Sequence, residues 1–142
     1  MSIEIVVAGR GSPPFPVELI AFEEDTYLVL SAGNLAREIR EETSELLGEM
    51  SNFDPLDRGT VLKRGQRLYA VVHDLDHQPS CDKRIVMRAL KEIVRICNEG
   101  GIHSIAIEPL GCTHGQLDND WFLNQLREIS TTSSLRRIWV YE

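Results

Sequence analysis

The sequence has few of the features that mark membrane, secreted or metal-bound proteins. No apolar run approaches the roughly 20 residues of a membrane-spanning helix. The three cysteines, Cys81, Cys97 and Cys112, form no CxxC pair, which argues against a disulfide framework and a structural zinc site. The start of the chain, MSIEIVVAGRG, lacks a basic region followed by a long apolar core. We therefore expect a cytoplasmic protein without membrane association.

Positive charge is also scarce. The chain has 15 lysine and arginine residues against 22 aspartate and glutamate residues, which gives a net charge of −7. This excess repels polyanions at long range, so double-stranded nucleic acid is not expected as a partner. A single diphosphate held by neutral backbone N–H groups is compatible with it. The 142 residues, 42% of them hydrophobic, are enough for one buried core, and we expect a single domain over residues 1–142.

Apolar runs alternate with amphipathic segments, which is the pattern of an α/β layered domain. The acidic residues 23–25 suggest the turn of a hairpin. Strands are expected at residues 3–7, 17–22, 27–30, 60–63, 68–72, 104–107 and 138–141. Helices are expected at residues 34–48, 80–98 and 118–129.

The stretch SIAIEPLGCTHGQLDNDW, residues 104–121, is the most informative segment. An apolar strand leads into a loop bracketed by Gly111 and Gly115, and the loop leads into a helix that Asp118 or Asn119 would cap. Free N–H groups in such a loop, beside a helix N-terminus, suit a phosphate. We predict a phosphorylated ligand here. The alternative is a tight turn that needs glycine for its backbone conformation alone.

Several short motifs in the second half carry a family resemblance. GTVLKRGQRLY at residues 59–69, LYAVVHD at 68–74 and NEGGIHSIAIEPLG at 98–111 occur in an order similar to that of a macro domain, the fold that binds ADP-ribose. Leu110 to Cys112 stand where the family has a Gly-Cys-Gly loop, followed by Leu117 and Trp121. The nearest subgroup is that of terminal ADP-ribose protein glycohydrolase and ADP-ribose 1″-phosphate phosphatase. The resemblance covers residues 59–142.

This resemblance implies a three-layer α/β/α fold with a mixed, mainly parallel sheet. It also implies a small phosphorylated nucleotide such as ADP-ribose as the ligand. The implied contacts come from the diphosphate loop, from the segment SAGN, which resembles the family's Asn-Ala-Ala-Asn, and from a tryptophan that walls the site: Gly111, Cys112, Thr113, His114, Gly115, Ser31, Asn34 and Trp121. By its sequence position alone, Asn34 is first a helix cap.

The first half departs from the family pattern. Gly9 and Arg10 stand where the family has a Gly-Asp pair that binds the adenine amino group, and no glycine-rich loop follows Asn34. The subgroup's catalytic Lys and Asp also lack counterparts. The helix after Asn34 offers Arg37 and Arg40, and arginine does not act as an amine nucleophile. We therefore expect nucleotide binding with little or no hydrolysis, and no cofactor.

Two other functions stay open from the sequence. One is a hydrolase that uses His114, Asp118 or a bound water in place of the family's catalytic groups. The other is an interaction module with an empty or remodelled cleft and a protein partner, which includes a homodimer. Cys112 and His114 could form a thiolate and base, but side chains at i and i+2 of an extended loop point to opposite faces. A buried Cys112 is expected instead.

The segment HDLDH at residues 73–77 contains side chains that bind metals. His73 and His77 would face the same way only in a helix, whereas the segment follows a strand and precedes Pro79. We expect an edge-of-sheet loop with solvated charges and no metal site. His73 also matches a histidine in the strand of the macro-domain family. Finally, Gly111→Val is expected to abolish ligand binding with little change in the fold.

Overall fold

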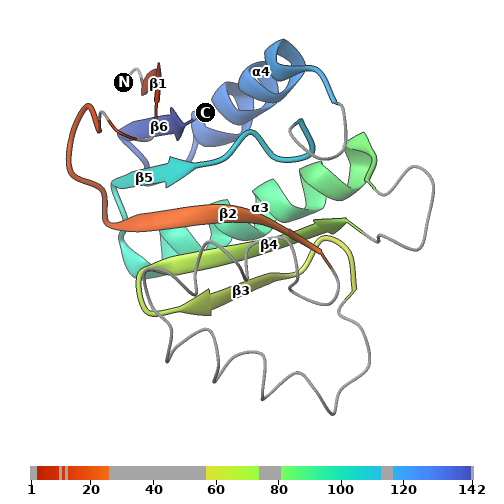
Figure 1. Cartoon of the computed structure of the whole chain (residues 1–142). Coiled ribbons are helices and arrows are strands. Elements are labelled where there is room, and N and C mark those ends of the chain that lie inside the picture. The colour runs from red at the N-terminus through yellow and green to blue at the C-terminus, as the bar shows by residue number, and fades with distance from the viewer. Residues whose placement is uncertain are drawn as a thin grey trace.

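The computed structural model describes residues 3–9, 11, 13–25, 57–73, 81–112 and 117–141. These residues contain a six-stranded sheet in the order β1-β6-β5-β2-β4-β3 (Figure 1). The strands are β1 (Glu4–Ala8), β2 (Leu19–Asp25), β3 (Val61–Arg64), β4 (Arg67–His73), β5 (Ser104–Ile107) and β6 (Arg137–Tyr141). Only β3 and β4 pair antiparallel, and the other pairings are parallel. The sheet is mixed and mainly parallel, as predicted.

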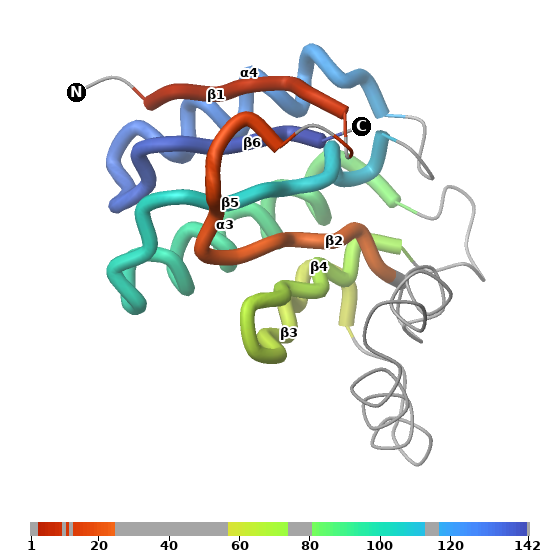
Figure 2. Tube along the Cα trace, turned by 60° about the vertical axis from the view of Figure 1, so that its left-hand side comes forward, coloured from red at the N-terminus to blue at the C-terminus, as the bar shows by residue number. Residues whose placement is uncertain are grey.

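Helices α3 (Lys83–Gly100) and α4 (Asn119–Ser130) pack against one face of this sheet (Figure 2). Their buried side chains join those of the central strands in the main hydrophobic cluster. A smaller cluster on the other face contains Phe15, Ala106, Trp139 and Tyr141. No helix in the described part of the chain is long and apolar enough to span a bilayer.

The long helix α3 follows directly from its sequence. Its buried residues recur at helical spacing, which gives one apolar face: Val86, Ala89, Leu90, Ile93 and Cys97. The Asp82 side chain caps the helix by accepting a hydrogen bond from the Ile85 N–H at 3.0 Å. Gly101 ends it in the left-handed conformation, with φ of 62°. The predicted helix at 80–98 is confirmed, with ends shifted by a few residues.

Strand β2 differs from its prediction. Residues 23–25 were expected to form a hairpin turn, but they continue β2, which pairs in parallel with β4 on one side and β5 on the other. Glu23 and Glu24 are buried in this strand. The prediction of a turn at 23–25 is therefore wrong, because these residues belong to a strand of seven residues. The expected strand at 27–30 and helix at 34–48 lie outside the described residues.

Candidate functional site

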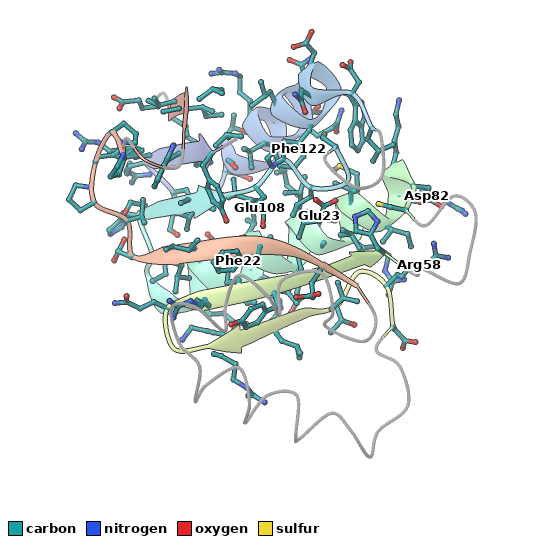
Figure 3. All side chains as sticks on the ribbon, viewed as in Figure 1. Phe22, Glu23, Arg58, Asp82, Glu108 and Phe122 are labelled. Atoms are coloured by element: carbon teal, nitrogen blue, oxygen red, sulfur yellow. The ribbon has the colours of Figure 1, made fainter. Side chains whose placement is uncertain are left out.

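The candidate site lies where β2, β4 and β5 end. In open parallel sheets, ligands bind outside the carboxyl ends of the strands. Glu23 on β2, His73 at the end of β4 and Glu108 just after β5 lie at this edge, with exposed fractions of 2%, 0% and 8%. Figure 3 labels Glu23 and Glu108 near one another, on β2 and just after β5. We call this group, with Gly111, the acidic edge.

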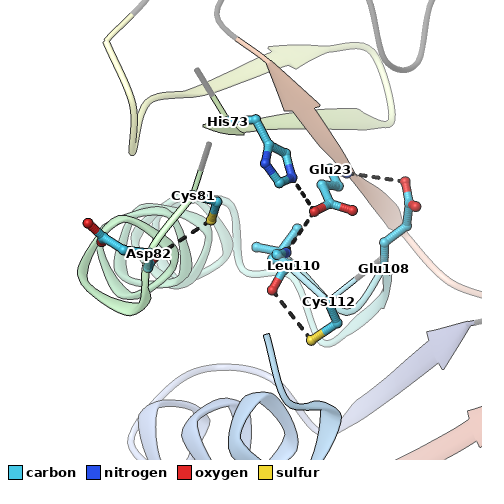
Figure 4. Close-up of polar contacts among 8 residues, drawn as sticks. Glu23, His73, Cys81, Asp82, Glu108, Leu110 and Cys112 are labelled. Carbon is cyan, nitrogen blue, oxygen red and sulfur yellow. Dashed lines mark hydrogen bonds and ion pairs between the residues drawn. The ribbon is translucent and has the colours of Figure 1, made fainter. Parts of the chain in front are cut away.

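Hydrogen bonds join the members of the acidic edge (Figure 4). The Glu23 Oε1 atom accepts a hydrogen bond from the Gly111 N–H at 2.8 Å. The same oxygen forms an ion pair with Nε2 of His73. The Glu23 N–H donates to Oε1 of Glu108 at 3.1 Å. Glu23 therefore connects its own strand to β4 and to the loop that follows β5.

The second oxygen of the Glu23 carboxylate has different surroundings. Glu23 Oε2 is buried, and no hydrogen-bond donor in the described part of the chain reaches it. A buried acceptor without a donor costs roughly 1–3 kcal/mol, and more when it is charged. Glu24, the next residue, is also fully buried. The acidic edge thus concentrates carboxylate groups away from water, although no cluster among the described residues could hold a metal ion.

Gly111 is required by the geometry of the loop after β5. Its φ is 77°, and an added Cβ would lie 2.6 Å from Leu117 Cδ1, 3.1 Å from Val86 Cγ2 and 3.2 Å from Cys81 Sγ. A β-branched side chain would therefore strain the backbone and overlap the core. The expectation that Gly111→Val leaves the fold little changed is wrong. The tight-turn interpretation accounts for this glycine.

The first two N–H groups of the loop already have acceptors within the protein. Gly111 donates to Glu23, and the Cys112 N–H donates to the Pro109 carbonyl at 3.0 Å. Leu117, at the far end of the loop, donates to the Gly111 carbonyl at 2.9 Å. A phosphate that bound to the Gly111 N–H would have to displace a carboxylate.

Cys112 is half-buried, and its environment opposes ionisation. Burial, with the nearby charges of Glu23 and Asp118, raises the pKa of the Cys112 thiol to about 11. Its Sγ lies 3.7 Å from the Leu110 carbonyl oxygen as a weak hydrogen-bond donor. At neutral pH the group is a thiol, so the geometry does not favour a thiolate nucleophile.

Beside the loop, the N-termini of α3 and α4 lie close together. The Lys83 ammonium, in the first turn of α3, lies 5.2 Å from the ring centroid of Trp121, in the first turn of α4. The Asp118 side chain makes no capping hydrogen bond with α4, and a helix N-terminus carries free N–H groups and the positive end of its dipole. Asp120 in the same turn offsets part of that charge. We call Lys83 and Trp121 the cationic rim.

The structure places only part of the predicted site. Gly111, Cys112, Asp118 and Trp121 surround the end of β5 and the start of α4. The remaining predicted contacts lie outside the described residues: Ser31, Asn34, Thr113, His114 and Gly115. His73 was expected in a solvated loop, and this is wrong because it is the fully buried last residue of β4. The rest of segment 73–77 is not described.

Sequence reasoning missed the role of Glu23, Glu24 and Glu108. The available signal was the run LIAF before the first two, since an apolar run of this length can continue as a central strand. Glu108 similarly follows the apolar run of β5 by one residue. Parallel strands place such residues at one common edge of the sheet.

Solved structures identify the fold. The macrodomain of Thermus aquaticus DarG superposes with a TM-score of 0.72 at 21% identity, over 99% of this chain and 97% of that one. The macrodomain of Mycobacterium tuberculosis DarG gives 0.74 at 12% identity, over 99% of both chains. A mutant of the Oceanobacillus iheyensis macrodomain, solved with ADPR, gives 0.71 at 13% identity, over 97% of this chain and 84% of that one.

The chain therefore has the three-layer α/β/α fold of the macrodomains, as the sequence resemblance implied. No protein-family model matches it, and no curated protein matches it in sequence. The likeness thus lies in the three-dimensional fold.

Proposed function

We propose that this chain binds ADP-ribose or a related phosphorylated nucleotide at the carboxyl edge of its sheet, without hydrolysing it. The observation that carries the proposal is the macrodomain fold over nearly the whole chain, shared with a protein solved with ADPR. In open α/β sheets of this kind, the carboxyl edge is the usual ligand site. The acidic edge lies there.

The two sides of this edge suit different parts of a nucleotide. The carboxylates of the acidic edge are acceptors for hydroxyl and amino groups. The cationic rim combines Lys83 with the uncapped start of α4, and a helix N-terminus favours phosphate. We propose that the phosphates bind near this rim and near the loop at residues 111–115. Trp121 would then form part of the wall.

Several residues argue for binding without hydrolysis. The Cys112 thiol is protonated at neutral pH because burial and nearby carboxylates raise its pKa to about 11. The segment after Asn34 carries Arg37 and Arg40 where, by the sequence resemblance, the glycohydrolases have their lysine. A hydrolase would have to use His114, Asp118 or a bound water, and no observation among the described residues favours that route.

Calorimetry with ADP-ribose, AMP and inorganic phosphate tests the proposal. We expect ADP-ribose to bind most tightly, because it reaches both the acidic edge and the cationic rim. Lys83→Gln should weaken ADP-ribose binding about fivefold, as loss of one phosphate contact would do. Lys91→Gln is the matched control, because Lys91 is exposed further along α3, and its affinity should be unchanged.

Two outcomes would contradict the proposal. Absence of ADP-ribose binding at millimolar concentration would rule out the ligand, and would favour the protein-interaction module. Release of ADP-ribose from an ADP-ribosylated protein, in an assay followed by chromatography, would contradict the absence of hydrolysis.

A further inference from the structure

The two oxygens of the Glu23 carboxylate have unequal surroundings. Oε1 receives the Gly111 N–H at 2.8 Å and pairs with His73. Oε2 is out of contact with solvent, and no donor in the described part of the chain reaches it. One acceptor position of this side chain is therefore open, on a strand that pairs with β4 and β5.

The charges around Glu23 decide which chemistry this open position accepts. Glu24 and Glu108 are buried carboxylates on the same edge, and His73 is the basic group in contact with Glu23. Phosphate oxygens placed here would face like charge. They would also find the Gly111 N–H occupied. A hydrogen-bond donor on the ligand would instead meet an acceptor that is already free of water, so no solvent has to be removed from that oxygen.

We propose that Glu23 selects which part of the ligand enters the inner end of the site. Its open oxygen, Oε2, receives a neutral hydrogen-bond donor of the nucleotide, either a ribose hydroxyl or an exocyclic amine. Its occupied oxygen, Oε1, keeps phosphate away from the Gly111 N–H. The inference rests on the proposed function, since it concerns the orientation of a nucleotide bound at the same edge.

Glu23→Gln tests this directly, because glutamine has the same shape and no charge. Its amide oxygen can still accept the Gly111 N–H, while its NH2 group replaces the open acceptor with a donor. Adenosine and inorganic pyrophosphate are the two probes, measured by calorimetry. We expect adenosine affinity to fall about tenfold if the donor is the exocyclic amine, which cannot accept from the new NH2 group, and about threefold if it is a hydroxyl, which exchanges a charge-assisted hydrogen bond for a neutral one. We expect pyrophosphate affinity to rise about fivefold, because a negative charge has gone.

Inosine separates the two sources of the donor, because it carries the ribose hydroxyls but no exocyclic amine. If inosine and adenosine lose affinity equally in Glu23→Gln, the donor is a ribose hydroxyl. If only adenosine loses affinity, the donor is the amine. Both results support the proposal and assign the group.

Glu92→Gln is the matched control, because it removes the same charge from the exposed side of α3 and should change neither probe. Glu108→Gln removes a charge from the acidic edge but leaves Glu23 Oε2 in place, and its amide oxygen can still accept the Glu23 N–H that Glu108 Oε1 receives at 3.1 Å. Pyrophosphate should therefore bind somewhat better to Glu108→Gln, and its adenosine affinity should fall less than that of Glu23→Gln.

Thermal unfolding of each variant shows whether it is folded. If Glu23→Gln does not fold, Glu23→Asp keeps the charge but draws the carboxylate back by one methylene. Adenosine affinity should then fall without any gain for pyrophosphate.

The proposal is overturned if a folded Glu23→Gln binds adenosine as well as the natural chain does, or if pyrophosphate affinity does not rise. Absence of ADP-ribose binding to the natural chain would instead overturn the proposed function. ADP-ribose binding that persists, with neither probe affected by Glu23→Gln, would overturn only the selection by Glu23.

Discussion

Two glutamates, Glu18 just before β2 and Glu23 in its second half, accept backbone N–H groups from the region of β5. At the amino edge, Glu18 Oε2 accepts the His103 N–H at 2.6 Å and the Ser104 N–H at 3.0 Å. At the carboxyl edge, Glu23 Oε1 accepts the Gly111 N–H at 2.8 Å. The bonds are alike, but Glu18 is exposed and Glu23 is 2% exposed.

The difference in burial separates a structural contact from a candidate functional one. Water can replace the acceptor of any N–H that Glu18 releases, so this contact adds modestly to the pairing of β2 with β5. At Glu23 no water is available, and loss of the carboxylate would leave the buried Gly111 N–H without this acceptor. Of the two glutamates, only Glu23 also holds an unpartnered oxygen away from water. The amino edge therefore stabilises the sheet, whereas we propose that the carboxyl edge also selects the ligand group.

Paired alanine variants should produce the largest difference between the two edges. Glu23→Ala leaves the buried Gly111 N–H without its acceptor and removes a buried contact of His73, and we expect a loss of about 3–5 kcal/mol in unfolding free energy. Glu18→Ala should cost less than about 1 kcal/mol, since water replaces the lost acceptor. Urea unfolding of both variants checks this. Equal losses would show that burial does not distinguish these contacts.

Glycine variants give the next largest effect. Gly111→Ala should lose about 2–4 kcal/mol, from the positive φ and from overlap with Leu117. Gly65→Ala is the matched control: its φ is 61° and no atom lies within 4 Å of an added Cβ. It should lose only about 1–2 kcal/mol, the conformational part. Similar losses at the two positions, measured by urea unfolding, would remove the crowding argument for the loop after β5.

The parts of the fold that the sequence predicts are those with a local periodicity. Helix α3 has five buried residues at helical spacing, a capping Asp82 and a terminating Gly101, so its sequence specifies it almost completely. The hairpin of β3 and β4 is similarly marked by Gly65 between two short apolar runs. Both elements are confirmed within a few residues.

The acidic edge could not be predicted because its environment is created by distant segments. Three successive acidic residues at 23–25 resemble a solvated turn in sequence, yet β4 and β5 flank them and Glu108 and Gly111 contact Glu23 from 85 and 88 residues away. Hydropathy pattern carries no information on such partners. The sequence predicts a phosphate loop at 111–115, but the first N–H group of this loop donates to a carboxylate that no local motif reveals.

The pKa of the Cys112 thiol should report a smaller effect of the Glu23 charge at the carboxyl edge. The Glu23 charge is one cause of the raised pKa of Cys112, after burial itself. Glu23→Gln should therefore lower this pKa, by less than about one unit because burial remains. The pH dependence of alkylation at Cys112, followed by mass spectrometry, measures the change. An unchanged profile would place the Glu23 charge too far from the thiol to affect it.

The smallest effect concerns the exposed glutamate at the amino edge. The His103 N–H is the main cause that lowers the pKa of Glu18 below its ordinary value of 4.5. A carboxyl whose folded-state pKa is lowered adds stability above its unfolded-state pKa, and this is lost as the pH falls through the folded-state pKa. The unfolding free energy of the natural chain should thus decline more below about pH 4.5 than that of Glu18→Gln.

Glu18 is exposed, so water screens its carboxylate. The difference in unfolding free energy between the natural chain and Glu18→Gln should therefore be small. Urea unfolding at pH 6 and at pH 3 gives the unfolding free energies of the natural chain and of Glu18→Gln. The difference between these two free energies should change between the two pH values. Glu128→Gln, an exposed charge change on α4, serves as the control and should show no such change. A direct titration of the Glu18 carboxyl carbon by NMR gives the sign independently. A midpoint at or above 4.5 would mean that the two N–H contacts do not stabilise the Glu18 carboxylate in solution. The contacts of Glu18 and Glu23 would then be alike in geometry alone.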